Sequence, residues 1–251
     1  MLHEPVHQQL ARLGLRGAAD ALVRLPLHDD VLDPLAVLLQ AEGLRRDSLG
    51  QARRLKLARL SQSAPWPMST CVARAAWAIP ASSRLLSFNW FKRHQHLLLV
   101  GPTGIGKSYL GCALAEALID RKKSVRYLRL PRLREEMARL QAHVRIGQWL
   151  KTLGRIYLLI LDDFGLAQMS PSHQPLPLEQ LEDRHRRGSV LVTSQLPIKL
   201  WHGQFQDPTL ADAILDRLVH KAQITELTGD SMRKKNPPTT LTEDDKPSPK
   251  I

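Results

Sequence analysis

The chain has 251 residues, 43% of them hydrophobic and 5% aromatic, which is enough for a core built mainly from Leu, Ala, Val and Ile. It contains no apolar run near the ~20 residues of a membrane-spanning helix, no secretory signal and only two cysteines, so we expect a cytoplasmic protein without a membrane partner. The net charge of +12 favours a polyanionic partner, above all nucleic acid, over a protein that is merely basic.

Apolar residues at helical spacing predict an all-helical segment over residues 1–60. A second amphipathic run opens at Asp33-Pro34, and a third, over 51–60, carries cations on one face and leucines on the other. Its cations are our candidates for DNA contact, although a solvated helix face explains them almost as well. They are Arg53, Arg54, Lys56 and Arg59.

Two stretches lack such a pattern. Residues 61–88 hold three prolines, and no period is sustained there, which predicts a linker. Residues 234–251 combine prolines with polar residues and are expected to be disordered.

From residue 89 the pattern alternates between strand and helix. We expect strands over 96–100, 124–130, 156–161 and 189–193, and helices over 107–119, 133–150 and 178–186. Such alternation predicts an α/β fold over residues 89–233, with a parallel sheet flanked by helices.

A phosphate-binding loop lies between the first strand and its helix. The sequence fits G-x-x-x-x-G-K-[ST], and the strand before it and the helix after it are the context that this motif requires. Backbone N–H groups and the helix N-terminus would bind phosphate, Lys107 would reach the β- and γ-phosphates, and Ser108 would bind Mg²⁺. The loop consists of Gly101, Pro102, Thr103, Gly104, Ile105, Gly106, Lys107 and Ser108.

A pair of carboxylates, Asp162 and Asp163, ends the strand over 156–161. Two carboxylates at a strand tip are costly unless a cation offsets their charge. We assign Asp162 to the Mg²⁺ and Asp163 to the attacking water; the alternative is a pair that only opens a turn. Together with the loop, the pair predicts binding of a nucleoside triphosphate.

Four stretches of the C-terminal part form a recognisable pattern: Ser194-Gln195-Leu196-Pro197, Trp201-His202, the run from Asp207 to His220 and the run from Glu226 to Lys234. They resemble a known family, the IstB ATPases encoded beside the transposase of IS21-type insertion sequences, which are similar to helicase loaders of the DnaC type. The resemblance covers residues 1–60 loosely and 89–235 closely.

The resemblance implies an AAA+ P-loop fold, hydrolysis of ATP to ADP and phosphate, a homo-oligomeric ring or spiral, largely non-sequence-specific DNA binding, and a transposase partner in target selection. Gln195, or its neighbour Ser194, matches the first sensor of the γ-phosphate. Arg217 matches an arginine finger that reaches a neighbouring subunit, and Arg233 matches a second sensor; fixed guanidinium groups suit such roles. A surface cation on a helix is the alternative for Arg217.

Two positions depart from the family pattern. Asp163 stands where many AAA+ proteins have a glutamate, and the shorter side chain is expected to slow hydrolysis. Residues 68–77 replace an acidic patch and an Arg-Gly-Leu-Asp-like segment, which led us to the hypothesis of a stretch translated out of frame.

Other functions stay open from the sequence. A DnaC-like helicase loader would share the fold but differ in partner, and a nucleotide-gated DNA-binding adaptor would bind ATP without hydrolysing it. A small-molecule kinase fits least, because it would need neither the Arg217 and Arg233 regions nor the excess positive charge.

Overall fold

The computed structural model describes residues 3–24, 29–64, 85, 87–142, 146–166, 188–220, 222–229 and 231. The chain divides into two compact units, residues Met1–Lys56 and Leu57–Ile251. None of the helices in these described ranges has the length and apolar character needed to cross a membrane.

The N-terminal unit is helical, as its periodicity predicts. It comprises α1 (His3–Arg12), α2 (Arg16–Arg24) and most of α3 (Asp29–Ala58), and Gly14, with a φ of 76°, turns the chain between α1 and α2. The second and third expected runs form one continuous helix. Glu42 pairs with both Arg45 and Arg46 on α3, which supports the helix between those runs. The small core consists of Val6, Leu10, Ala19, Leu22 and Leu39.

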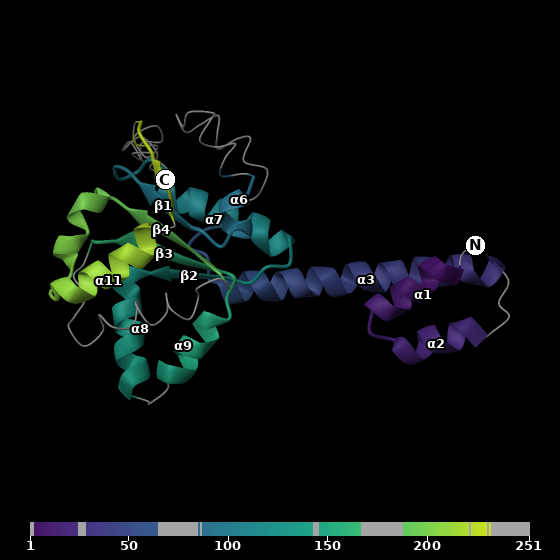
Figure 1. The fold of residues 1–251 in the computed structure, drawn as a ribbon. Helices are drawn as coiled ribbons and strands as arrows, with labels where there is room; N and C mark the ends of the chain where they lie inside the picture. The colour runs from purple at the N-terminus through teal and green to yellow at the C-terminus, as the bar shows by residue number, and fades with distance from the viewer. Residues whose placement is uncertain are drawn as a thin grey trace, which may run out of the picture. The chain divides into compact units, whose positions relative to one another are not determined.

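The second unit contains a five-stranded parallel sheet in the order β2-β3-β4-β1-β5 (Figure 1). All four expected strands form, within three residues of their expected bounds. The strands are β1 (His96–Val100), β2 (Val125–Arg129), β3 (Leu158–Phe164), β4 (Ser189–Ser194) and β5 (Ala222–Glu226). We did not expect β5: it is an edge strand with little burial, so no apolar run marks it.

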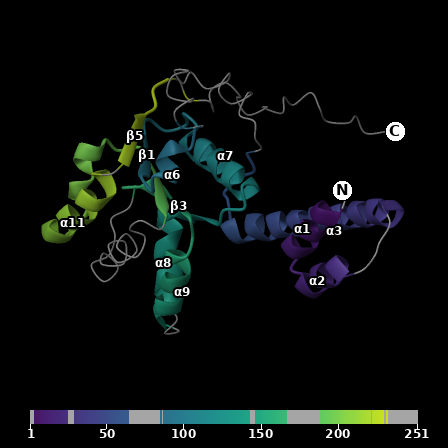
Figure 2. The same cartoon turned by 45° about the vertical axis from the view of Figure 1, so that its right-hand side comes forward.

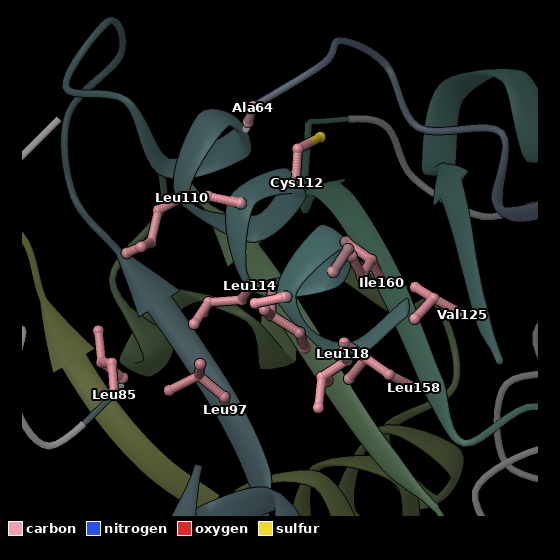
Figure 3. Packing of buried hydrophobic residues seen from close by; sticks show 14 of the residues in the cluster. Ala64, Leu85, Leu97, Leu110, Cys112, Leu114, Leu118, Val125, Leu158 and Ile160 are labelled. Carbon is pink, nitrogen blue, oxygen red and sulfur yellow. The ribbon is translucent and has the colours of Figure 1, made fainter. Parts of the chain in front are cut away.

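Helices cover both faces of this sheet (Figures 1 and 2). On one face α7 packs its leucines against β1 and β3 (Figure 3), while apolar residues of α8, α9 and α11 pack on the other. Neighbouring residues Leu97 and Leu98 of β1 belong to these two opposite layers, as alternation along a strand requires. The helices are α6 (Asn89–Lys92), α7 (Lys107–Asp120), α8 (Leu130–Ala142), α9 (Ile146–Gly154) and α11 (Pro208–Val219).

Some expected elements differ or lie outside the described residues. The helix expected over 133–150 is two helices, α8 and α9. The helix expected over 178–186, most of the expected linker and the C-terminal tail fall outside the described ranges, as do residues 68–77. At the start of the expected linker, the backbone N–H of Ala64 donates to Glu116 Oε1 on α7 at 2.9 Å, so residues 61–64 pack on this helix.

Candidate functional site

The loop after β1 curls because its glycines adopt backbone angles that other residues rarely reach. Gly101, Gly104 and Gly106 have φ values of 154°, 79° and 94°, and Gly106 forms the N-terminal cap of α7 in a left-handed conformation. The N-terminus of α7, with its positive dipole end, therefore lies at the loop. This arrangement is suited to binding an anion.

The ammonium of Lys107 lies inside this loop. Its Nζ donates hydrogen bonds of 2.7 Å to the carbonyl oxygens of Gly101 and Pro102, and the residue is only 7% exposed. Burial lowers the pKa of Lys107, while the charges of Asp163 and Asp162 oppose that shift. The loop thus surrounds a desolvated cation next to two carboxylates.

Asp162 contacts the end of the loop through Ser108, and it is 3% exposed. The Ser108 hydroxyl donates to its Oδ1 at 2.8 Å, so α7 and β3 meet at this pair. The Thr193 hydroxyl donates to the same oxygen and the Tyr127 hydroxyl donates to Oδ2. Serine and aspartate oxygens in contact are the donor set that Mg²⁺ prefers, so these residues fit the ion.

Tyr127 and Thr193 were not among the residues that the sequence singled out. Both lie on strands that pair with β3, near the strand ends that meet at its carboxyl edge. Desolvation, followed by the hydrogen bond to Asp162, raises the pKa of Tyr127 well above its ordinary value, so its hydroxyl stays a donor at neutral pH. The available signal was a hydroxyl-bearing side chain near the carboxyl end of each of two expected strands.

Asp163 occupies an unusual backbone position beside a second cation. Its φ of 63° accompanies a register shift in the pairing of β3 with β4 between Leu161 and Phe164. Its Oδ2 lies 2.7 Å from Arg129 Nε, and this carboxylate raises the pKa of Arg129 through a hydrogen bond and its charge. The backbone N–H of Asp163 donates to Thr193 Oγ1 at 3.2 Å, which ties both aspartates to one hydroxyl.

The structure separates the two candidates for the first sensor. Ser194 is fully buried; its hydroxyl donates to the carbonyl of Phe164 at 2.8 Å and accepts from the N–H of Leu196 at 3.1 Å. Gln195, one residue later, lines the cavity in front of the loop. The geometry therefore favours Gln195.

Lys107, Ser108, both aspartates and Gln195 line one cavity of about 810 Å³ at the carboxyl edge of the sheet, where ligands of parallel α/β proteins usually bind. Four arginines form part of its wall, including Arg59, which we had considered for DNA contact. The lining residues include Thr103, Gly104, Gly106, Lys107, Ser108, Tyr127, Asp162, Asp163, Gln195, Arg59, Arg126, Arg129 and Arg132.

The two remaining arginine candidates are not brought to this cavity. Arg217 is exposed on the last turn of α11, a helix that packs through Ala211, Ile214 and Leu218. It is not among the residues that line this cavity, and its role stays a prediction. Arg233 lies outside the described residues.

The chain after β5 lies against the outside of the loop. A Cβ atom added to Gly101 would lie 2.3 Å from the carbonyl oxygen of Leu227, and one added to Gly104 would lie 2.1 Å from Ser231 Oγ. The N–H of Leu227 also donates to the carbonyl of Val100 at 2.7 Å. The loop is thus enclosed between its own lysine and this segment.

Comparison with known proteins agrees with this geometry. The profile of the family described as "IstB-like ATP binding protein" matches residues 8–239. A Sinorhizobium fredii protein described as an insertion sequence ATP-binding protein, y4uH, is 40% identical over 96% of this chain and 99% of its own length. A protein so described from IS21 of Pseudomonas aeruginosa is 31% identical over 80% of this chain and 76% of its own.

Solved structures show the same fold at lower identity. DnaI superposes with a TM-score of 0.52 at 22% identity, covering 59% of this chain and 81% of its own. The DnaC helicase loader superposes with a TM-score of 0.51 at 17% identity, covering 70% of this chain and 99% of its own. The fold is that of an AAA+ P-loop NTPase, and the chain belongs to the IstB family of insertion-sequence ATP-binding proteins.

Proposed function

We propose that this protein binds ATP with Mg²⁺, hydrolyses it to ADP and phosphate, and serves as the DNA-binding helper of a transposase in target selection. The observation that carries the proposal is the contact between Ser108, at the start of α7, and the buried Asp162, beside a loop that holds Lys107. Relatives described as insertion-sequence ATP-binding proteins support the biological setting.

The loop residues bind and orient the nucleotide. Backbone N–H groups of the loop and the ammonium of Lys107 would bind the β- and γ-phosphates, exchanging the lysine's present carbonyl partners for phosphate oxygens. Ser108 and Asp162 would hold Mg²⁺, which neutralises phosphate charge when it is bound.

Asp163 and Gln195 would act on the attacking water. Both line the cavity; we assign Gln195 to a hydrogen bond with the water or the γ-phosphate, and Asp163 to orienting the water or accepting its proton. In the described conformation Asp163 pairs with Arg129, so its carboxylate must first leave that guanidinium. Hydrolysis in the resting protein is therefore expected to be slow.

We further propose that the active form is a homo-oligomer assembled on DNA. The net charge of +12 supports DNA binding, and the exposed position of Arg217, outside its own cavity, supports a role at the site of a neighbouring subunit. Arg233 is proposed as a second sensor on the sequence resemblance alone.

A second candidate function is a nucleotide-gated adaptor that binds ATP and DNA but does not hydrolyse ATP. The ion pair between Asp163 and Arg129 favours it, because it occupies the carboxylate proposed to handle water. A helicase loader has only the fold in its favour, at identities of 22% and below.

Measuring ATP binding and phosphate release side by side tests the proposal. Fluorescent ATP should bind to the full chain in the presence of Mg²⁺, and phosphate release should rise when duplex DNA is added. Binding without release, with DNA and the transposase both present, would establish the adaptor instead. No binding at all would reject the assignment of the loop.

A further inference from the structure

The buried Asp162 carboxylate is held by hydroxyl groups from three different elements. Ser108 on α7 and Thr193 on β4 donate to Oδ1, and Tyr127 on β2 donates to Oδ2. Ser108 is also the residue proposed to bind Mg²⁺. When its hydroxyl turns to the ion, Thr193 and Tyr127 remain as one donor for each carboxylate oxygen.

The surroundings hold these two hydroxyls in place. Tyr127 and Thr193 are both buried, on strands that pair directly with β3. Ser61 Oγ lies 3.4 Å from Cys112 Sγ on α7, and Ser61 acts on the Tyr127 hydroxyl by lowering its pKa. Thr193 also accepts the N–H of Asp163, so its hydroxyl has little freedom to turn away.

A carboxylate with no such partners could rotate about its terminal torsion, which is broad for aspartate. Donors that fix the orientation of a metal-binding carboxylate commonly matter about as much as the ligand itself, and their loss costs roughly 10- to 100-fold in metal affinity. The hydroxyls also compensate the charge of Asp162 while no cation is present.

We propose that Tyr127 and Thr193 are positioning residues that orient Asp162 for the divalent cation and so set the Mg²⁺ dependence of nucleotide binding. This inference rests on the proposed function, since it takes the cation to be bound by Ser108 and Asp162. Both residues act through Asp162, to which their hydroxyls are hydrogen-bonded.

The test compares Tyr127→Phe with Tyr157→Phe in the full chain. Tyr157 is a half-exposed tyrosine outside the cavity, next to Lys123, and gives the same chemical change away from the site. Binding of fluorescent ATP is titrated with Mg²⁺ at fixed nucleotide and is also measured in EDTA. Tyr127→Phe should raise the half-saturating Mg²⁺ concentration roughly tenfold or more, with affinity in EDTA unchanged, whereas Tyr157→Phe should match wild type.

Thr193 provides a second, independent pair of variants should Tyr127→Phe fold poorly. Thr193→Val removes the hydroxyl at nearly constant volume and should also raise the half-saturating Mg²⁺ concentration. Thr193→Ser keeps the hydroxyl and should titrate with Mg²⁺ as the wild type does. If the folded Tyr127→Phe or Thr193→Val protein has the same half-saturating Mg²⁺ concentration as wild type, the inference is overturned and the proposed function stays intact. If nucleotide binding by the wild-type chain does not respond to Mg²⁺, the cation assignment fails and both fall.

Discussion

The two units of this chain place their polar groups in different ways. In the N-terminal unit the polar contacts are surface ion pairs such as Arg12 with Asp47 and Glu42 with Arg45, around a small apolar core. In the sheet unit the contacts of Asp162 are buried, and apolar layers on both faces of the sheet hold the strands that carry them. Surface ion pairs typically contribute less than about 1 kcal/mol to the free energy of unfolding, so apolar periodicity determines the structure of the helical unit. In the sheet unit, buried hydrogen bonds hold the carboxylate of Asp162 in one position.

The largest expected effect tests whether the sheet unit of one chain holds every group needed for ATP hydrolysis. Arg217→Ala should lower hydrolysis by ~10³-fold or more while ATP binding stays nearly intact, because an arginine finger stabilises charge that develops only in the transition state. Phosphate release and fluorescent ATP binding measure the two quantities.

Mixing Arg217→Ala with Lys107→Ala subunits should restore part of the hydrolysis, since intact loops would meet intact arginines at some interfaces. If the mixture stays inactive despite proven co-assembly, Arg217 acts within its own chain or only structurally.

Lysines in the two units should differ sharply in their effect on the nucleotide. Lys107→Ala should weaken ATP binding by roughly 10- to 100-fold, because a hydrogen bond to a charged group contributes about 1.5–3 kcal/mol. Lys56→Ala, an exposed cation on α3, should leave ATP affinity unchanged. Titration with fluorescent ATP measures both affinities, and equal effects of the two variants would contradict the assignment of nucleotide binding to the sheet unit.

DNA binding is expected to depend on exposed cations of the helical unit. Replacing Arg53 and Lys56 together by alanine should reduce the slope of log affinity against log salt by about 2, because each phosphate contact contributes about 1. Titrations of a duplex at several salt concentrations measure this slope. Lys199→Ala, an exposed cation of the sheet unit, is the control; a larger change there would move the DNA contact to that unit.

The Arg129–Asp163 pair of the sheet unit is open to solvent on one side, because Arg129 is 50% exposed. Arg129→Gln should free Asp163 and raise DNA-independent phosphate release, but only up to about fivefold, since a pair so open to solvent contributes at most about 1 kcal/mol. Lys122→Gln, a surface cation outside the cavity, serves as control. A lower rate in Arg129→Gln would show that the pair supports catalysis instead.

The smallest effect concerns Glu42, whose hydrogen bonds to Arg45 and Arg46 lower its pKa to about 2. A depressed pKa means that its contribution to stability is fully present above the ordinary value of 4.5 and is lost as pH falls through about 2. Because the group is solvent-exposed, the difference in melting temperature between wild type and Glu42→Gln should be small at neutral pH and vanish near pH 2. A difference independent of pH would exclude this origin.

The sequence predicted those features that depend on local pattern. The bounds of β1, the loop around Lys107 and the parallel sheet all follow from an apolar run, a glycine spacing and alternation. The edge strand β5 has no such run, and the contacts of Tyr127 and Thr193 with Asp162 depend on which strands become neighbours, which one sequence does not state. The roles of Arg217 and Arg233 stay predictions, the first because it concerns a second copy of the chain.

The close contacts of Gly101 and Gly104 with Leu227 and Ser231 bear on how substitutions accumulate in this part of the gene. Each glycine answers to two requirements at once, a backbone angle within the loop and clearance from the chain that leaves β5. A mutation to alanine would displace that segment, so the amount of soluble protein in the cell should fall, whatever happens to nucleotide affinity. A drifting copy of such a gene should therefore retain these two glycines for as long as selection maintains a folded product, and lose Lys107 freely once selection for ATP binding ends.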